Sequence, residues 1–164
     1  PSSVELFEPP NSLRMKAKER LTPEEAAQRL DFEIKVAREL LNSEKLRRDA
    51  FQVCIQWRLL QDQMPGHASC NAHLAKIADL TRSIVKRSRE MSQDQAASWS
   101  DSILAAVEGL ELGVDRNASM HLLGHAALSL NHVFRPETPA SEQLAEIDAT
   151  VAIIRARMAQ KLAS

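Results

Sequence analysis

The chain has 164 residues, 44% of them hydrophobic and 26% charged, and this composition excludes a largely disordered protein. Aromatic residues make up only 4%, with four glycines and no tyrosine, which disfavours folds built from many short strands and tight hairpins. The formal net charge of −1 excludes an overall basic nucleic-acid binder, because such proteins need excess cations to displace counterions. The length suits one domain with its own core, and the composition predicts an all-α fold.

Cysteine content and hydropathy predict a cytoplasmic protein that does not enter a membrane. Two cysteines, Cys54 and Cys70, are too few for a disulfide framework and indicate a reducing compartment. The sequence contains no run of about 18 apolar residues and no charged start followed by an apolar stretch. Because the chain begins at Pro1 rather than Met, a preceding targeting segment remains open.

Residues 1–21 are predicted to form an extended arm, because they hold three prolines, a small apolar group and a charged run. Two interpretations stand side by side for this arm. It is either a loose tail or a strap that docks on a groove of its own domain or of a partner. In the second case Phe7 is a candidate partner contact.

The first helix is predicted to start at Thr22-Pro23-Glu24-Glu25, where Thr is the N-cap, Pro the first helical residue and Glu25 closes a capping box. An apolar stripe at steps of three and four follows, and it slips out of phase at residues 42–44 before it restarts. The stripe consists of Ala27, Leu30, Ile34, Ala37 and Leu41, and then of Leu46, Ala50, Val53, Trp57, Leu60 and Met64. The helix must therefore kink, break or meet a different neighbour at the slip; unbroken, residues 22–64 would span roughly 65 Å.

Further helices are predicted by similar signals along the rest of the chain. Pro65-Gly66 ends the first helix, and the next runs from His67 to Met91. Ser92 and Gln95 form a capping box that opens a helix ending at Gly113. The last two helices begin at Asp115 or Ser119 and at Thr138-Pro139. Residues 22–164 are thus predicted to form a single domain, an up-and-down antiparallel bundle of five to six helices.

Histidines on one predicted helix suggest a metal site. His121 and His125 are four residues apart, so their rings leave adjacent turns of one helix face. Cys70 and His73 on another helix would complete a set of four ligands. The competing interpretation is that these are ordinary core or half-buried side chains, since zinc needs all four ligands within about 2.3 Å of one point.

The stretch Met120-His121-Leu122-Leu123-Gly124-His125-Ala126-Ala127 resembles histidine-phosphotransfer domains, whose helical bundles carry a phosphorylatable histidine beside a lysine and a nearby glycine. It departs from that family because no lysine follows and the glycine comes one position early. The opening Leu21-Thr22-Pro23-Glu24-Glu25-Ala26-Ala27 looks like the start of some DNA-binding helix-turn-helix modules, although no glycine-bearing turn and recognition helix follow.

A basic stripe is predicted on the helix over residues 67–91. Arg82, Lys86 and Arg89 share one face and Arg87 continues it, so all four are candidate partner contacts. Such a stripe attracts phosphates or acidic partners, but nearby carboxylates such as Asp79 neutralise part of it.

The sequence carries no nucleophile elbow, phosphate-binding glycine loop or zinc-protease motif, and we expect neither an enzyme nor a bound cofactor. The prediction is a protein–protein interaction module that acts through apolar helix faces as an adaptor, chaperone, regulator or scaffold. A homodimer is expected, with its contact at residues 46–64 or on the histidine-bearing helix. The alternative is a nucleic-acid-associated regulator that uses Arg82, Lys86 and Arg89; a metal-binding bundle and a phosphotransfer-like protein are lesser alternatives.

Overall fold

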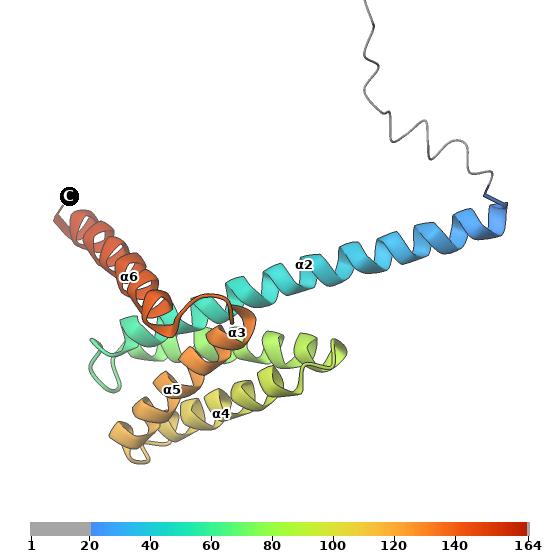
Figure 1. Ribbon diagram of the computed structural model, residues 1–164. Coiled ribbons are helices and arrows are strands. Elements are labelled where there is room, and N and C mark those ends of the chain that lie inside the picture. Colours follow the sequence, from blue (N-terminus) through green and yellow to red (C-terminus); the bar gives the residue numbers. More distant parts are fainter. Residues whose placement is uncertain (1–20, 164) are drawn as a thin grey trace, which may run out of the picture. The chain divides into compact units, whose positions relative to one another are not determined.

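The structure is a computed structural model that describes residues 21–163, and its regular elements are all helices (Figure 1). They are α2 (Pro23–Leu60), α3 (Ala68–Glu90), α4 (Asp94–Glu111), α5 (Arg116–Phe134) and α6 (Ala140–Ala163). The described range contains no strand, so the predicted all-α helical bundle is confirmed. The predicted arm, including Phe7, lies outside the described residues except for Leu21.

The described residues belong to two compact units that meet within the sequence of α2. One unit contains the chain up to Arg38, and the other contains the chain from Glu39 onward. Within the described residues, the first unit thus holds the amino-terminal turns of α2, whereas the second holds the rest of that helix and α3 to α6.

The start of α2 is the capping box that the sequence predicts. The hydroxyl of Thr22 accepts a hydrogen bond from the backbone N–H of Glu25 (3.2 Å), and the Glu25 carboxylate accepts one from the backbone N–H of Thr22 (2.8 Å). The backbone N–H and the hydroxyl of Thr22 both donate to the Glu25 carboxylate, and they hold the pKa of that carboxyl below its usual value because they stabilise the ionised form. The cap satisfies helix N–H groups that have no partner within the helix.

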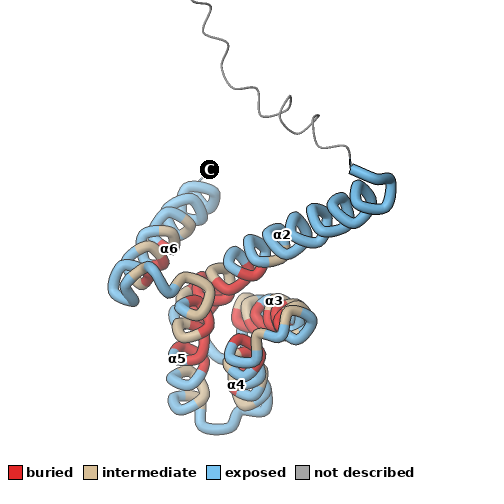
Figure 2. Tube along the Cα trace, turned by 45° about the vertical axis from the view of Figure 1, so that its right-hand side comes forward, coloured by how far each residue is buried: buried red, intermediate tan, exposed pale blue. Residues whose placement is uncertain are grey.

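The predicted phase slip at residues 42–44 is a change of environment and not a break in α2. The helix is continuous from Pro23 to Leu60. Its residues are almost all exposed up to Lys45, and the stripe that restarts at Leu46 is buried in the second unit (Figure 2). The helix ends at Leu60, before Met64, which is exposed.

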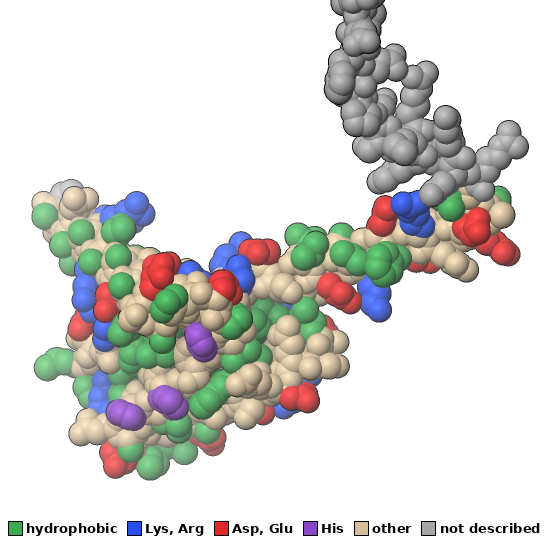
Figure 3. Space-filling model, viewed as in Figure 1, with side chains coloured by type: hydrophobic (Ala, Val, Ile, Leu, Met, Phe, Trp, Pro, Cys, Tyr) green, Lys and Arg blue, Asp and Glu red, His purple; other side chains and the backbone are tan. Residues whose placement is uncertain are grey.

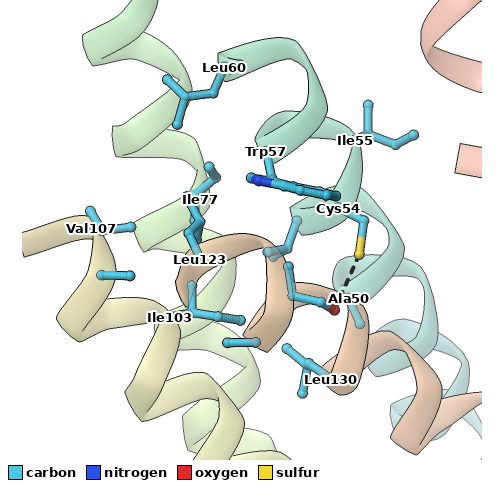
Figure 4. Close-up of a cluster of buried hydrophobic side chains, with 14 of the residues drawn as sticks. Ala50, Cys54, Ile55, Trp57, Leu60, Ile77, Ile103, Val107, Leu123 and Leu130 are labelled. Atoms are coloured by element: carbon cyan, nitrogen blue, oxygen red, sulfur yellow. Dashed lines mark hydrogen bonds between the residues drawn. The ribbon is translucent and has the colours of Figure 1, made fainter. Parts of the chain in front are cut away.

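The core of the second unit is built from α2 beyond Lys45 together with α3, α4 and α5. Figure 4 shows its centre, where Ala50, Cys54, Ile55, Trp57 and Leu60 of α2 lie with Ile77, Ile103, Val107, Leu123 and Leu130. The Cys54 thiol donates to the backbone oxygen of Ala127 (3.3 Å), and burial raises its pKa to about 12. This thiol is therefore a neutral packing group, and it is no nucleophile at physiological pH.

The connection from α3 to α4 differs from the predicted capping box. Ser92 adopts a left-handed conformation (φ 54°), and the N–H of Gln93 donates to the backbone oxygen of Ser88 (2.8 Å). Ser92 therefore terminates α3, in a position where glycine is usual, and α4 begins at Asp94 without a side-chain cap. The predicted capping box of Ser92 and Gln95 is therefore wrong, although a helix does begin at this point of the sequence, as predicted.

The start of α5 and the packing of α6 complete the bundle. Asp115 caps α5 by accepting from the N–H of Ala118 (3.1 Å), as one of the two predicted starts requires. α6 contributes buried side chains only up to Val151, and Arg58 of α2 binds Asp148 on α6 through two hydrogen bonds of 2.8 and 2.9 Å. Beyond Val151 the helix is largely exposed, including Met158.

None of the helices in residues 21–163 combines the length and apolar character that crossing a bilayer requires.

Candidate interaction surface

The amino-terminal turns of α2 expose large apolar side chains. The exposed fractions are 57% for Leu30, 42% for Ile34, 64% for Phe32 and 71% for Leu41, and Figure 3 shows such side chains on the surface of α2. The sequence predicts that the stripe from Ala27 to Leu41 lies on one helix face, and in the described chain this face is exposed. Helical periodicity shows that one face of a helix is apolar, but it does not show whether another part of the same chain packs against that face.

These apolar residues fall on two neighbouring ridges of the helix. Ala27, Leu30, Ile34 and Ala37 form the first ridge, which we call the α2 seam. Phe32, Val36 and Leu40 form the second ridge at steps of four, and all three are exposed. Lys35 lies on the opposite, polar side of the helix together with Gln28. A surface of this kind is a candidate contact for another polypeptide, because monomers rarely expose contiguous apolar patches.

Charged side chains border the α2 seam. Arg29 and Glu33 form an ion pair one turn apart, with 3.9 Å between Arg29 Nε and Glu33 Oε1. Arg38 follows Glu33 by five residues and is exposed. The border thus carries both signs of charge, which suits a partner whose own border is also mixed.

The homodimer contact predicted at residues 46–64 is not available on the second unit. From Leu46 to Leu60 the apolar side chains of α2 are buried among α3, α4 and α5. This part of the helix is the central helix that the sequence predicts, and its partners are the other helices of the same unit.

The basic stripe of α3 exists, and carboxylates neutralise part of it. Arg82, Lys86 and Arg89 border a shallow hollow of about 390 Å³. Arg82 pairs with Asp79 (3.1 Å), and Arg89 pairs with Asp101 of α4 (3.4 Å). These exposed pairs are weak, yet they lower the positive potential that a phosphate would meet.

Two other basic groups serve contacts within the second unit. Arg87 does not join the stripe, because it points toward α2 and pairs with the largely buried Asp49 (3.1 Å). Arg47 donates to the backbone oxygen of Phe134 (3.1 Å) and pairs with Glu137 (3.3 Å). Their role in the described structure is to join helices.

His121 and His125 lie together on α5, at the surface. Both border a hollow of about 470 Å³, whose other lining residues are Trp57, Gln61, Asn117, Met120, Gly124 and Leu128. The ring of His125 stands edge-on to Trp99, with 5.4 Å between centroids. The lining contains neither carboxylate nor thiol, so the two imidazoles are its only strong candidate metal ligands.

The other two predicted metal ligands lie elsewhere. Cys70 is buried in the core, and the Nδ1–H of His73 donates to Gln56 Oε1 (2.7 Å). Burial, and secondarily the charge of Lys76, lower the pKa of His73. Within residues 21–163 no three His, Cys, Asp or Glu side chains come together in a way that could hold a metal ion.

Sequence reasoning missed the role of Gly124. A Cβ at this position would meet the indole of Trp57 well inside van der Waals contact, so the glycine lets the tryptophan approach α5 closely. The resemblance to histidine-phosphotransfer domains draws attention to this glycine, but its neighbour here is Trp57. A helical glycine in an apolar stretch is itself a signal of close packing.

The chain has no significant match among known protein families, curated protein sequences or solved structures.

Proposed function

We propose that the chain is a non-enzymatic protein–protein interaction module of the cytoplasm that acts through an apolar helix face. The observation that supports this proposal most directly is the exposure of Leu30, Ile34 and their neighbours on the amino-terminal turns of α2. Water around such a face is unfavourable by about 25 cal/mol for each square ångström of apolar surface, and a covering helix removes that cost. The role is regulatory or scaffolding, because the chemistry is burial of apolar surface.

Photocrosslinking tests this function. A photoreactive phenylalanine analogue replaces Ile34 on the α2 seam in one variant and Lys35 on the polar side in a matched control. In the cells that naturally contain the protein, we expect irradiation to join a polypeptide to position 34 and much less to position 35. The proposal fails when position 34 yields no adduct, or when both positions yield the same adducts.

The nucleic-acid alternative depends on Arg82, Lys86 and Arg89. The ion pairs of Arg82 and Arg89 with carboxylates weigh against it. Retention of the purified chain on DNA or RNA over a series of salt concentrations separates the two functions. Retention that falls steeply as the salt concentration rises, and that Lys86→Glu abolishes, would favour nucleic-acid binding. No retention supports apolar docking.

A further inference from the structure

The α2 seam has the spacing of a coiled coil. With Ile34 at position a of a heptad, Ala27 is the preceding a residue, and Leu30 and Ala37 are d residues. The next a position is Leu41, which is also exposed. Among parallel coiled coils, isoleucine at a together with leucine at d favours two strands over three or four. The spacing thus indicates which kind of surface fits the seam.

The charges that border the seam complement a second copy of the same seam. Glu33 occupies position g and Arg38 the following e position, and in a parallel pair g of one helix faces e of the next heptad on the other. Glu33 of one copy therefore meets Arg38 of the other, and two-fold symmetry forms this pair twice. Glu33 keeps its ion pair with Arg29 as well, because a carboxylate accepts several hydrogen bonds.

The remaining border positions bring no like charges together. In the same register Ala26 at g faces Asp31 at e, and Leu40 at g faces Lys45 at e. Leu40 adds apolar cover beside the seam, whereas Phe32 at f and Val36 at c stay outside a two-helix contact. The register therefore separates residues that a second copy covers from exposed apolar residues that it does not cover.

We infer that the protein forms a parallel, two-fold symmetric dimer in which the α2 seam of one copy packs against the α2 seam of its partner. This inference rests on the proposed function, and it identifies the polypeptide that covers the seam. The seam spans only about two heptads, so the dimer is in equilibrium with monomer.

Sedimentation equilibrium of the full chain tests self-association. The mass is expected to rise with concentration from 18.3 kDa toward twice that value. Ile34→Glu is expected to hold the mass at one chain, while the matched controls Lys35→Glu and Phe32→Glu keep the rise. A wild-type chain whose mass stays at that of one chain at all concentrations overturns the inference. A Phe32→Glu variant that is as monomeric as Ile34→Glu also overturns it, because the contact would then extend beyond the α2 seam.

Charge exchange tests the register. Glu33→Arg places two arginines opposite each other, and Arg38→Glu places two glutamates there, so each variant alone is expected to associate at least about tenfold more weakly. An equimolar mixture of the two variants restores both attractive pairs and is expected to associate better than either variant alone. Misfolding of either variant could not produce this recovery. Equal weakness of the mixture overturns the g to e pairing.

Cysteine crosslinking tests the parallel direction. In a parallel dimer residue 37 faces its own counterpart, so Ala37→Cys is expected to form a disulfide-linked dimer under mild oxidation. Lys35→Cys and the wild-type chain are the controls, because Cys54 and Cys70 are buried. If only a mixture of Ile34→Cys and Ala37→Cys crosslinks, the helices run antiparallel and the proposed direction is wrong.

The two proposals fail in different ways. A purified chain that remains monomeric, combined with a crosslink from position 34 to a different protein in cells, overturns the dimer and leaves the interaction module standing. A chain that yields no adduct at position 34 in cells contradicts the interaction module itself.

Discussion

Trp57 shows how closely the core of the second unit is packed at the level of single residues. Its indole lies on Gly124 of α5 and also lines the hollow beside His121 and His125. Arg58 lies next to it, with 5.2 Å between the guanidinium carbon and the centre of the indole ring. The indole thus connects the buried core with the surface at the histidines.

Gly124→Ala is expected to destabilise the protein by about 1–2 kcal/mol. Overpacking against the Trp57 ring costs about 1–3 kcal/mol, and the better helix propensity of alanine returns about 0.5–1 kcal/mol. Urea unfolding monitored by tryptophan fluorescence measures the difference. The matched control is Gly109→Ala, where the new methyl group would come too close to the hydroxyl of Ser119, which can rotate away, and would meet the Ser119 Cβ at ordinary contact distance. Equal effects of the two changes would contradict this account of Gly124.

The connection between α5 and α6 depends on one buried side chain at the scale of the helices. Gln143, near the start of α6, donates to the backbone oxygens of Arg135 (2.9 Å) and Thr138 (2.8 Å). Its Oε1 accepts from the side-chain amide of Asn131 on α5 (2.7 Å). α6 is otherwise joined to the unit by few buried residues, namely Ile147 and Val151. Gln143 therefore fixes where the last helix begins.

Gln143→Leu is expected to lower the free energy of unfolding by about 1–3 kcal/mol, because buried amide and carbonyl groups lose their partners. Gln160→Leu, the same exchange at an exposed position of α6, is the control and should change stability by less than about 0.5 kcal/mol. Hydrogen exchange of the amides in residues 140–163 should also become faster in Gln143→Leu alone. Unchanged exchange there would show that other contacts hold α6 in place.

Helix ends were predictable where one interpretation of the local sequence dominated. Thr22-Pro23-Glu24-Glu25 combines three helix-start signals, and its capping box is present. Ser92 fits a capping box with Gln95 by sequence, yet its backbone has the positive φ of a helix end, and α4 begins without a side-chain cap. The N–H of Gln93 instead donates to the backbone oxygen of Ser88 and closes the end of α3.

The whole molecule divides its apolar residues between a closed core and an exposed helix face. Leu130 is fully buried in the second unit, whereas Ile34 lies on the exposed α2 seam of the first. We therefore expect stability and the proposed association to depend on different residues. Both tryptophans lie in the second unit, so their fluorescence follows that unit alone.

Leu130→Ala is expected to destabilise the second unit by about 2–5 kcal/mol through the cavity it leaves. Ile34→Ala should change the unfolding of that unit by less than about 0.5 kcal/mol. Chemical denaturation followed by tryptophan fluorescence, at a dilution that dissociates the proposed dimer, compares the two. A large loss in Ile34→Ala would mean that the seam supports the second unit.

The helical class, most helix boundaries and the apolar faces follow from the amino-acid sequence, because these depend on local propensity, capping and periodicity along one chain. Which faces are covered follows from the packing of the helices: the stripe from Leu46 to Leu60 is buried, while Leu30 and Ile34 remain exposed. The same packing also separates His121 and His125 from Cys70 and His73 and pairs Arg87 with Asp49. The physical reason is that burial and pairing depend on which helices meet in space, and periodicity within one helix carries no information about its neighbour.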